Sequence, residues 1–229
     1  MARPAGLFVT GTDTGVGKTV VAQAIIGALA ELDLDVAAMK PVETGVGPNG
    51  PEDAQALAKA IRHSEPLDVI CPLQFSLPAA PLVAAEDAQQ PLEVGNIRKA
   101  WKQIRERHDF VVVEGAGGLL VPLIDDLDMA GLAAEMEIPI VIVARAALGT
   151  INHTLLTLRE AERRALEVVG VVFSHQAGPL SDADQKNFAA LKKSLGPLVI
   201  GEIPFLSHPE TVAPDLLDGP DLWKRLEPK

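Results

Sequence analysis

A glycine-rich loop near the amino end is the feature that most constrains what this chain can fold into. Three apolar residues at 7–9 precede it, and apolar residues recur at helical spacing over 20–29 after it. The loop ends in Gly17, Lys18 and Thr19. In a strand, loop and helix of this kind, the loop N–H groups and the helix N-terminus face one concave site that suits phosphate. The sequence therefore predicts a nucleotide-binding loop.

The loop residues suggest how a triphosphate would be held. Lys18 is expected to place its charge on the outer phosphates, and Thr19 its hydroxyl on a magnesium ion that bridges them. The motif is a variant, because Thr12 stands where the first glycine is expected and Gly11 comes one residue too early. An ordinary glycine-rich turn is the alternative. The residues expected to bind nucleotide are Asp13, Thr14, Gly15, Val16, Gly17, Lys18 and Thr19.

The composition bounds the class of protein. With 229 residues, 48% of them hydrophobic, the chain is long enough for a large core and short enough to form one α/β domain over residues 1–229. It has 31 acidic and 20 basic residues, which argues against nucleic acid or an anionic membrane surface as a partner. Cys71 is the only cysteine and is expected to be a small buried residue of a cytoplasmic protein. Neither a signal peptide nor a membrane span is expected.

Short apolar runs alternate with helical patterns along the chain. This alternation predicts a doubly wound, mainly parallel sheet of about six or seven strands, with helices on both faces. The prolines of residues 66–92 predict irregular structure with one short helix around 82–87, and a proline-rich tail is expected at the end. Further strands are expected at residues 36–39, 110–113, 138–143, 168–173 and 198–203, and further helices from about residue 52 and over residues 97–107, 128–135, 151–164 and 182–194.

Several polar residues come directly after the predicted strands, at the edge where ligands of such sheets bind. Glu114 closes one strand and is expected to hold magnesium, with a plain surface acid as the alternative. Asp53, in the first turn of a polar-capped helix, is either a second magnesium ligand or an acid favoured by the helix dipole. Lys40 either stabilises transferred phosphoryl charge or only extends to solvent. Thr150 is a candidate N-cap of a helix whose free N–H groups suit a carboxylate.

Four sequence blocks occur in one order along the chain. They are GTDTGVGKT at 11–19, KPVETG at 40–45, VVVEGAGGLLVP at 111–122 and LGTINHTLLT at 148–157. Together they resemble the dethiobiotin synthetases, and the resemblance extends to GEIPFL at 201–206. It implies an ATP- and Mg2+-dependent cyclo-ligase that makes dethiobiotin, ADP and phosphate from 7,8-diaminopelargonate, carbon dioxide and ATP. The implied path is carbamylation of one amine, phosphorylation of the carbamate, and attack of the second amine with loss of phosphate.

The resemblance also implies roles for individual residues. Lys18 and Lys40 would neutralise the carbamate and the γ-phosphate, and Thr14 would contact substrate or phosphate. Magnesium would be held by Thr19, Asp53 and Glu114. The implied substrate contacts are Thr44, Gly117, Gly118, Gly149, Thr150, Ile151 and Asn152. In this family the last four contacts come from the other subunit of a homodimer.

Two departures from the family pattern concern the nucleotide. Gly15 stands where members often have an acid, so a side-chain contact to nucleotide or metal is missing. Many members recognise adenine with an Asn after the strand at 168–173, where this chain has Ser-His-Gln at 174–176. Weak base discrimination is therefore expected, unless the backbone at 204–206 supplies another contact. The candidate base contacts are Ser174, Pro204, Phe205 and Leu206.

An ATP-driven switch that positions cell-division or chromosome machinery is the competing interpretation, because it would share the fold and the Glu-Gly strand end. Those proteins carry a signature lysine early in the loop, where this chain has Asp13. No basic amphipathic helix for a membrane occurs at the C-terminus. A relative that binds nucleotide without catalysis is disfavoured by the intact Lys18, Thr19, Lys40 and Glu114.

Overall fold

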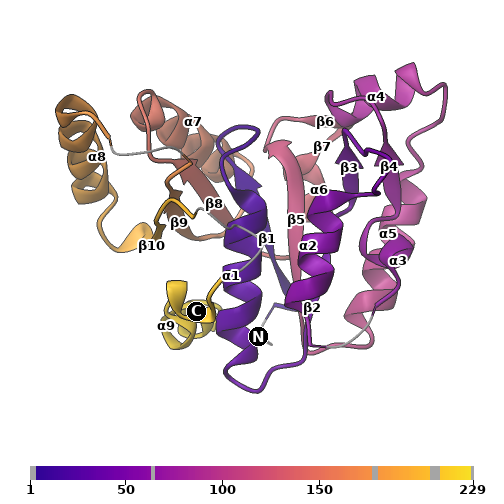
Figure 1. The fold of residues 1–229 in the computed structure, drawn as a ribbon, viewed down its shortest axis with the longest axis horizontal. Coiled ribbons are helices and arrows are strands. Elements are labelled where there is room, and N and C mark those ends of the chain that lie inside the picture. Colours follow the sequence, from indigo (N-terminus) through magenta and orange to yellow (C-terminus); the bar gives the residue numbers. More distant parts are fainter. Residues whose placement is uncertain (1–3, 63–64, 177–179, 207–211, 228–229) are drawn as a thin grey trace.

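The first strand of the chain lies in the middle of the main sheet. The computed structural model describes residues 4–62, 65–176, 180–206 and 212–227, and its largest sheet has six parallel strands in the order β10-β9-β8-β1-β5-β2 (Figure 1). The doubly wound parallel sheet is thus confirmed. The main-sheet strands are β1 (Gly6–Gly11), β2 (Val36–Met39), β5 (Phe110–Gly118), β8 (Ile140–Arg145), β9 (Val168–Ser174) and β10 (Val199–Ile203).

The two strands that flank β1 begin as continuous apolar runs. β5 starts with Phe-Val-Val-Val and β8 with Ile-Val-Ile-Val, and all eight side chains are fully buried. β-branched residues favour extended backbone, and an apolar run without alternation suits a strand covered on both faces. The register pairs Val9 of β1 with Glu114 of β5 and with Val141 of β8. The carboxyl ends of these strands therefore meet along one edge.

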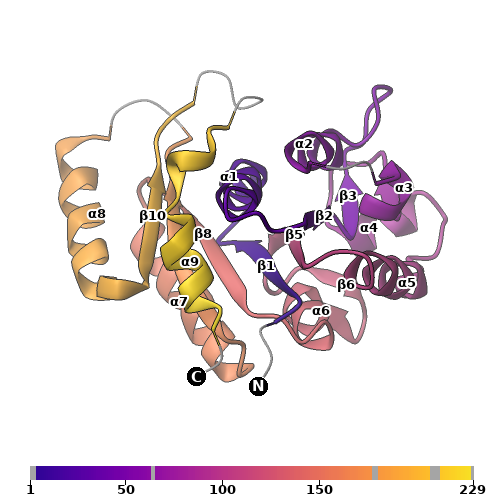
Figure 2. The ribbon, with the colours of Figure 1, turned by 90° about the horizontal axis from the view of Figure 1, so that it is seen from below.

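Helices cover both faces of this sheet (Figure 2). One core cluster joins it to α5, α6, α7 and α8, and a second joins it to α1, α2 and α9. The helices are α1 (Lys18–Ala30), α2 (Glu52–Ala60), α3 (Leu67–Ile70), α4 (Pro81–Asp87), α5 (Val94–Arg105), α6 (Met129–Glu135), α7 (Thr150–Arg163), α8 (Asp182–Leu195) and α9 (Gly219–Arg225), with 3-10 turns η1 (Gly196–Leu198) and η2 (Pro214–Leu216).

Helix α1, which carries the phosphate loop, is packed on its outer side as well. The C-terminal segment of η2 and α9 lies against it (Figure 1). Leu217, Leu222 and Leu226 of that segment are buried in the same core cluster as α1. At Gly219 a side chain would overlap the Ala28 carbonyl, so helix and tail approach closely.

Four short features differ from the sequence-based expectation. Residues 66–92 contain α3 and strand β4 (Leu73–Phe75) besides the predicted α4, and β4 pairs in parallel with β3 (Val42–Thr44). An antiparallel pair, β6 (Pro122–Ile124) and β7 (Leu127–Asp128), comes after β5. The tail forms α9, with Asp218 as N-cap and a proline in the first turn. Elements of two to seven residues show too little periodicity to be recognised, and the prolines here begin helices instead of preventing them.

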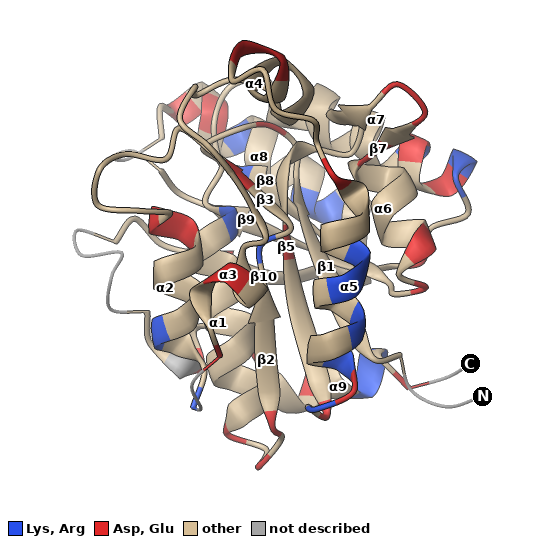
Figure 3. Cartoon of the chain, turned by 90° about the vertical axis from the view of Figure 1, so that its right-hand side faces the viewer, with Lys and Arg blue, Asp and Glu red and all other residues tan. Residues whose placement is uncertain are grey.

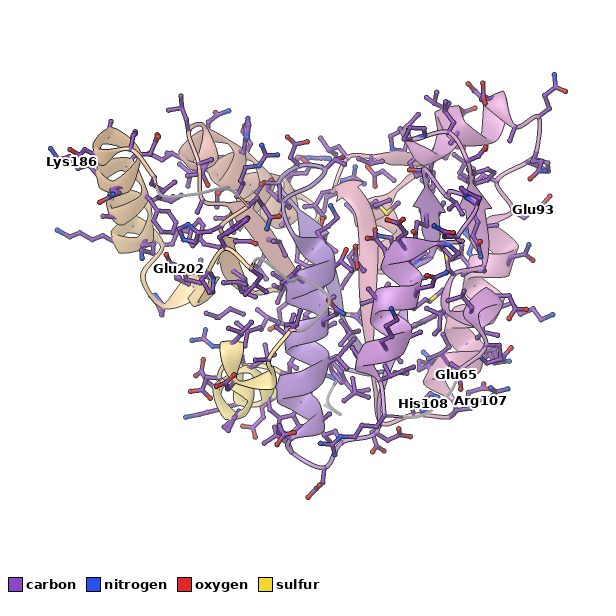
Figure 4. The ribbon with its side chains drawn as sticks, in the orientation of Figure 1. Glu65, Glu93, Arg107, His108, Lys186 and Glu202 are labelled. Carbon is purple, nitrogen blue, oxygen red and sulfur yellow. The ribbon has the colours of Figure 1, made fainter. Side chains whose placement is uncertain are left out.

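A cluster of ionisable side chains connects three segments at the opposite, amino edge of the sheet. His108 lies between two carboxylates, with Nδ1 2.9 Å from Asp35 Oδ2 and Nε2 2.9 Å from Glu65 Oε1. Arg107 adds an ion pair to Glu65 at 3.3 Å (Figure 4). These contacts tie the residues before β5 to those before β2 and α3, far from the phosphate loop.

On the face of the molecule shown in Figure 3, basic residues are grouped in local clusters. On the face shown in Figure 3, Lys and Arg line one side of α5, while acidic residues are scattered over the loops and helix ends. Among the described helices, none has the length and apolar character needed to cross a membrane. An anionic ligand must therefore be held by individual lysines and backbone N–H groups and not by a broadly positive surface.

Candidate active site

The phosphate loop connects the carboxyl end of β1 to α1. Gly15 and Gly17 have φ values of 66° and 91°, in the left-handed region that glycine adopts without strain. Gly17 is the N-cap of α1 and no side chain caps this helix. The first N–H groups of α1 thus remain available, and with the positive end of the helix dipole they suit phosphate.

A cavity of about 590 Å³ lies beside this loop. It brings together residues of the phosphate loop, α1, β3, α2 and β5 with Lys40, the residue that follows β2, and these segments are far apart in the sequence. The sequence-predicted residues that line it are Thr14, Gly15, Gly17, Lys18, Thr19, Lys40, Thr44, Asp53, Glu114 and Gly117. The convergence expected at the carboxyl ends of the strands therefore occurs in this cavity for the phosphate loop, Lys40, Asp53 and Glu114, but not for Thr150.

Lys40 is the centre of the charge network in the cavity. The side chain is only 4% exposed, and its Nζ lies 2.6 Å from Asp53 Oδ2 and 2.6 Å from Glu114 Oε1. Burial alone would lower the pKa of Lys40, but the charges of Glu114 and Asp53 outweigh it and hold the pKa above its ordinary value. Lys40 is therefore a fixed positive charge and not a lysine that extends to solvent.

Thr19 joins the same network through its hydroxyl. The Oγ1 atom lies 2.9 Å from Asp53 Oδ1 and 3.1 Å from Glu114 Oε1. Burial opposes ionisation of Asp53, yet the Lys40 charge and hydrogen bond lower the pKa of Asp53 below its ordinary value. Burial raises the pKa of the Glu114 carboxyl, against the pull of Lys40.

These residues fit a magnesium ion. Glu114 is 1% exposed and lies within β5, which continues to Gly118, and its Oε2 atom is buried with no hydrogen-bond partner. Across the described residues, no three His, Cys, Asp or Glu side chains gather into a metal-binding group. Two carboxylates and a hydroxyl next to a phosphate site match an ion that takes its remaining ligands from phosphate and water.

Lys18 is the second buried lysine of the cavity. Its Nζ donates a hydrogen bond of 3.1 Å to the Asp13 carbonyl, across its own loop. Burial lowers the pKa of Lys18, opposed in part by the charge of Glu114. A lysine whose ammonium is partly desolvated is ready to exchange a loop carbonyl for a phosphate oxygen.

Glu43 is a site residue that sequence reasoning missed. Its two carboxylate oxygens accept hydrogen bonds from the backbone N–H groups of Asp53 at 3.0 Å and Ala54 at 2.9 Å. The expected polar cap of this helix is therefore wrong as a local feature, because the N-cap residue is Pro51 and no side chain there bonds. The cap comes from β3 and fixes Asp53 in the cavity. An acid between Val42 and Thr44 in a short strand was the only sequence signal.

Arg145 was also missed. From the end of β8 its Nη2 donates a 3.3 Å hydrogen bond to the Thr14 carbonyl and lies 3.7 Å from Asp13 Oδ2. Asp13 in turn accepts a hydrogen bond from the Thr14 N–H. These contacts hold the outer part of the loop, where Gly15 has no neighbouring atom within 4 Å of an added Cβ.

Several predicted nucleotide and substrate residues do not line the cavity. Val16 is fully buried in the core, so only its backbone can contact a nucleotide. Ser174 is also fully buried, and its Oγ accepts a 2.5 Å hydrogen bond from Nε2 of Gln176, which does line the cavity. The predicted residues outside the cavity lining are Asp13, Val16, Gly118, Ser174, Pro204, Phe205 and Leu206.

Residues 149–152 line a different cavity, of about 400 Å³, between α7 and α8. Gly149, with φ 89°, is the N-cap of α7, so the expectation that Thr150 caps this helix is wrong. The left-handed backbone of Gly149 leads directly into the helix, so Thr150 is the first helical residue. The Thr150 hydroxyl forms a hydrogen bond with the Thr154 hydroxyl. Leu148 is 80% exposed and Leu156 is 56% exposed beside this cavity.

Comparison with known proteins identifies relatives along most of the chain. A family model described as an AAA domain matches residues 5–211. The chain is 48% identical to an ATP-dependent dethiobiotin synthetase of Anaeromyxobacter dehalogenans (strain 2CP-1), covering 77% of this chain and 79% of that one. It is 35% identical to that of Thermodesulfovibrio yellowstonii, covering 89% and 90%, and 34% identical to that of Bacillus subtilis subsp. natto, covering 89% and 88%.

Among solved structures, the chain is similar to a ParA family ATPase from Chlorobium tepidum TLS. The TM-score is 0.55 and the identity 14%, with 98% of each chain covered, so this likeness shows the fold alone. The sequence relatives, by contrast, are matched over most of the chain at 34% identity or more. The chain therefore belongs to the dethiobiotin synthetase family.

Proposed function

We propose that this ATP-dependent ligase of biotin synthesis forms dethiobiotin from 7,8-diaminopelargonate and carbon dioxide. The observation that carries the proposal is the network of Lys40, Asp53, Glu114 and Thr19 beside the phosphate loop. Together with Lys18 and the phosphate loop, this network places two positive side chains, two carboxylates and a row of backbone donors in one cavity. Transfer of a phosphoryl group to a carbamate needs this combination, because negative charge must be gathered and neutralised.

The proposed reaction has three balanced steps. One substrate amine adds to carbon dioxide and loses a proton, giving a carbamate. A carbamate oxygen takes the γ-phosphoryl group of ATP, so ADP leaves and a carbamic-phosphoric anhydride forms. The second amine attacks the carbamate carbon and loses a proton, the new C–N bond closes the urea ring, and phosphate leaves with the C–O bond electrons.

The lysines act as fixed charges in these steps. Lys40 is held by two carboxylates and cannot turn away, so it orients the carbamate without reorganising. Lys18 contacts the phosphoryl oxygens from the loop side. When bound, magnesium supplies charge neutralisation of the phosphates, and the residues that would hold it are Thr19, Asp53 and Glu114. Thr14, Thr44 and Gly117 line the same cavity and are proposed to position the diamine.

The substrate carboxylate is proposed to bind at residues 149–152 of a second subunit. In the single chain these residues line their own cavity, away from the phosphate loop. The exposed Leu148 and Leu156 beside them favour burial against another copy. The first turn of α7 has no side-chain cap, and its N–H groups suit a carboxylate.

The direct test of the reaction is mass-spectrometric detection of dethiobiotin. Purified protein is given 7,8-diaminopelargonate, bicarbonate, ATP and magnesium, and each component is omitted in turn. Dethiobiotin should form only in the complete mixture, with one ADP for each product. ATP turnover that does not depend on the diamine but increases with a membrane or protein partner would instead favour an ATP-driven switch that positions cell-division or chromosome machinery.

Lys18→Ala should lower turnover at least ~100-fold, because it removes a positioned charge from a phosphoryl-transfer site.

This variant also tests the shared site when mixed with Asn152→Trp. Asn152 is exposed in the first turn of α7, whereas any side chain at Gly149 would be strained by its φ of 89°. After forced subunit exchange, random pairing of a symmetric dimer should restore up to about a quarter of wild-type activity. Verified heterodimers without any recovery would contradict the shared site.

A further inference from the structure

The side chain of Gln176 lies where β9 ends, directly over the start of α1. Its Nε2 donates a hydrogen bond to Ser174 Oγ at 2.5 Å, and a Cβ placed on Gly17 would overlap both atoms. Glycine at position 17 is therefore required not only by its φ but also by the space that the Gln176 amide occupies. Since Ser174 is fully buried, the group presented to the cavity from β9 is the amide of Gln176.

The distribution of charge gives the direction of a nucleotide in this cavity. Lys40 directly follows β2, and Asp53 and Glu114 lie in α2 and β5, all on one side of the phosphate loop. The γ-phosphate and its magnesium belong there, because the Thr19 hydroxyl bonds to that group and Lys18 lines the same cavity. The α-phosphate and the nucleoside must then leave on the other side, toward β8 and β9. Gln176 is the polar side chain that lines the cavity on that side, within the part of the chain that the structure describes.

The hydrogen-bonding groups of Gln176 suit adenine. One N–H of the amide is used on Ser174, and among the described residues the Oε1 atom accepts no hydrogen bond. The amide therefore offers one acceptor and one remaining donor side by side. Adenine presents the complementary pair, an amino donor beside a ring-nitrogen acceptor, whereas guanine presents two adjacent acceptors on the corresponding edge.

We propose that Gln176 recognises the adenine base and that Ser174 positions its amide for this contact. The proposal rests on the use of ATP proposed above and adds the residue that selects the nucleotide. It changes the expectation from sequence alone, in which the lack of an Asn at the end of β9 predicts weak base discrimination. In this structure the side-chain amide comes from Gln176, two residues after the position where other members have the Asn. Ser174 occupies that position and accepts a hydrogen bond from the Gln176 amide.

The test is the ratio of binding affinities for two nucleotides, measured by calorimetry without turnover. The β,γ-imido analogues of ATP and GTP are titrated with magnesium into the full chain. Wild type should bind the adenine analogue more tightly. Gln176→Met should lower the adenine-to-guanine ratio by about tenfold or more, the usual value of a bidentate base contact.

Two further variants separate recognition from general effects. Gln176→Glu keeps the acceptor but removes the donor to the ring nitrogen of adenine, so it should lower the ratio as well. Ser174→Ala should lower the ratio by a smaller factor, because the amide is retained but less fixed. Gln90→Met, an exposed amide outside the cavity, is the matched control and should leave the ratio unchanged.

The outcomes distinguish this inference from the proposed reaction. An adenine preference that Gln176→Met abolishes, in a protein that forms no dethiobiotin, would support Gln176 and contradict the reaction. Equal losses for both nucleotides would place Gln176 on the ribose or phosphates and overturn the inference, even if dethiobiotin forms. Wild-type protein with no base preference would overturn it as well.

Discussion

Replacement of Lys40 by Met is the most informative perturbation, because Lys40 joins stability to catalysis. The substitution keeps most of the buried side-chain volume and removes the charge between Asp53 and Glu114. Loss of one partner of a buried ion pair costs about 3 to 5 kcal/mol. Asp53 is 41% exposed and can turn to water, and Glu114 can take up a proton, so about 3 kcal/mol is expected here. In a chain of this size that lowers Tm by about 6 to 12 °C.

The accompanying double variant isolates the cause of this loss. Adding Glu114→Gln to Lys40→Met removes the unpaired buried charge while keeping the shape of the side chain. Thermal unfolding measured by circular dichroism should show that the double variant recovers at least half of the lost stability. Turnover should remain at least ~100-fold below wild type in both variants, while nucleotide affinity changes less. A double variant less stable than Lys40→Met would refute the charge argument.

The pH dependence of the same variant has a defined sign. Burial already raises the pKa of Glu114 above its ordinary value of 4.5, and loss of Lys40 removes the charge that opposes this shift. A carboxyl with a raised pKa in the folded state favours folding while it is protonated, and that contribution is lost as the pH rises through the folded pKa. The stability lost in Lys40→Met should thus be smaller near pH ~5 than near pH ~8. Equal losses at both pH values would contradict an ionised Glu114 as the cause.

Two other predictions concern residues away from the network. Burial raises the pKa of the Cys71 thiol to about 12, so a thiol reagent at pH ~8 should label only the unfolded chain, and fast labelling of folded protein would contradict this environment. Gly6→Ala should destabilise the protein by about 1 to 3 kcal/mol, because the new Cβ would overlap the Val111 carbonyl of the neighbouring strand. Its matched control is Gly95→Ala in α5, where an added Cβ meets nothing within 4 Å and the helix should gain about 0.5 to 1 kcal/mol. Equal unfolding temperatures for the two variants would refute the packing argument.

The main sheet was predictable because its strands are strong local signals. A continuous apolar run such as Val111 to Val113 is typical of a strand in a sheet that is covered on both faces. The glycine loop, in turn, predicts a helix directly after β1. The cavity was predictable for the same reason, since Lys40 and Glu114 come directly after such runs and Lys18 follows the glycine loop that leaves β1. Parallel topology alone brings their carboxyl ends together.

What the sequence did not reveal depends on contacts between distant segments. Glu43 caps α2 from another strand, and the amide of Gln176 returns to the loop over Gly17. Neither residue has a local pattern that distinguishes it from an ordinary polar side chain. Helix α9 was missed because its prolines suggested irregular structure, whereas Asp218 and Pro220 together begin a helix.

The position of β1 has a consequence for the order in which the protein is made. β1 and α1 leave the ribosome long before β5 and β8, which are the neighbours of β1 in the sheet. The outer side of α1 stays uncovered until Leu217, Leu222 and Leu226 have emerged. The nucleotide loop therefore has to remain unassembled through most of translation, with its apolar helix exposed to chaperones or to other nascent chains. A carboxy-terminal truncation would prolong that exposure, although it removes no residue that contacts the cavity.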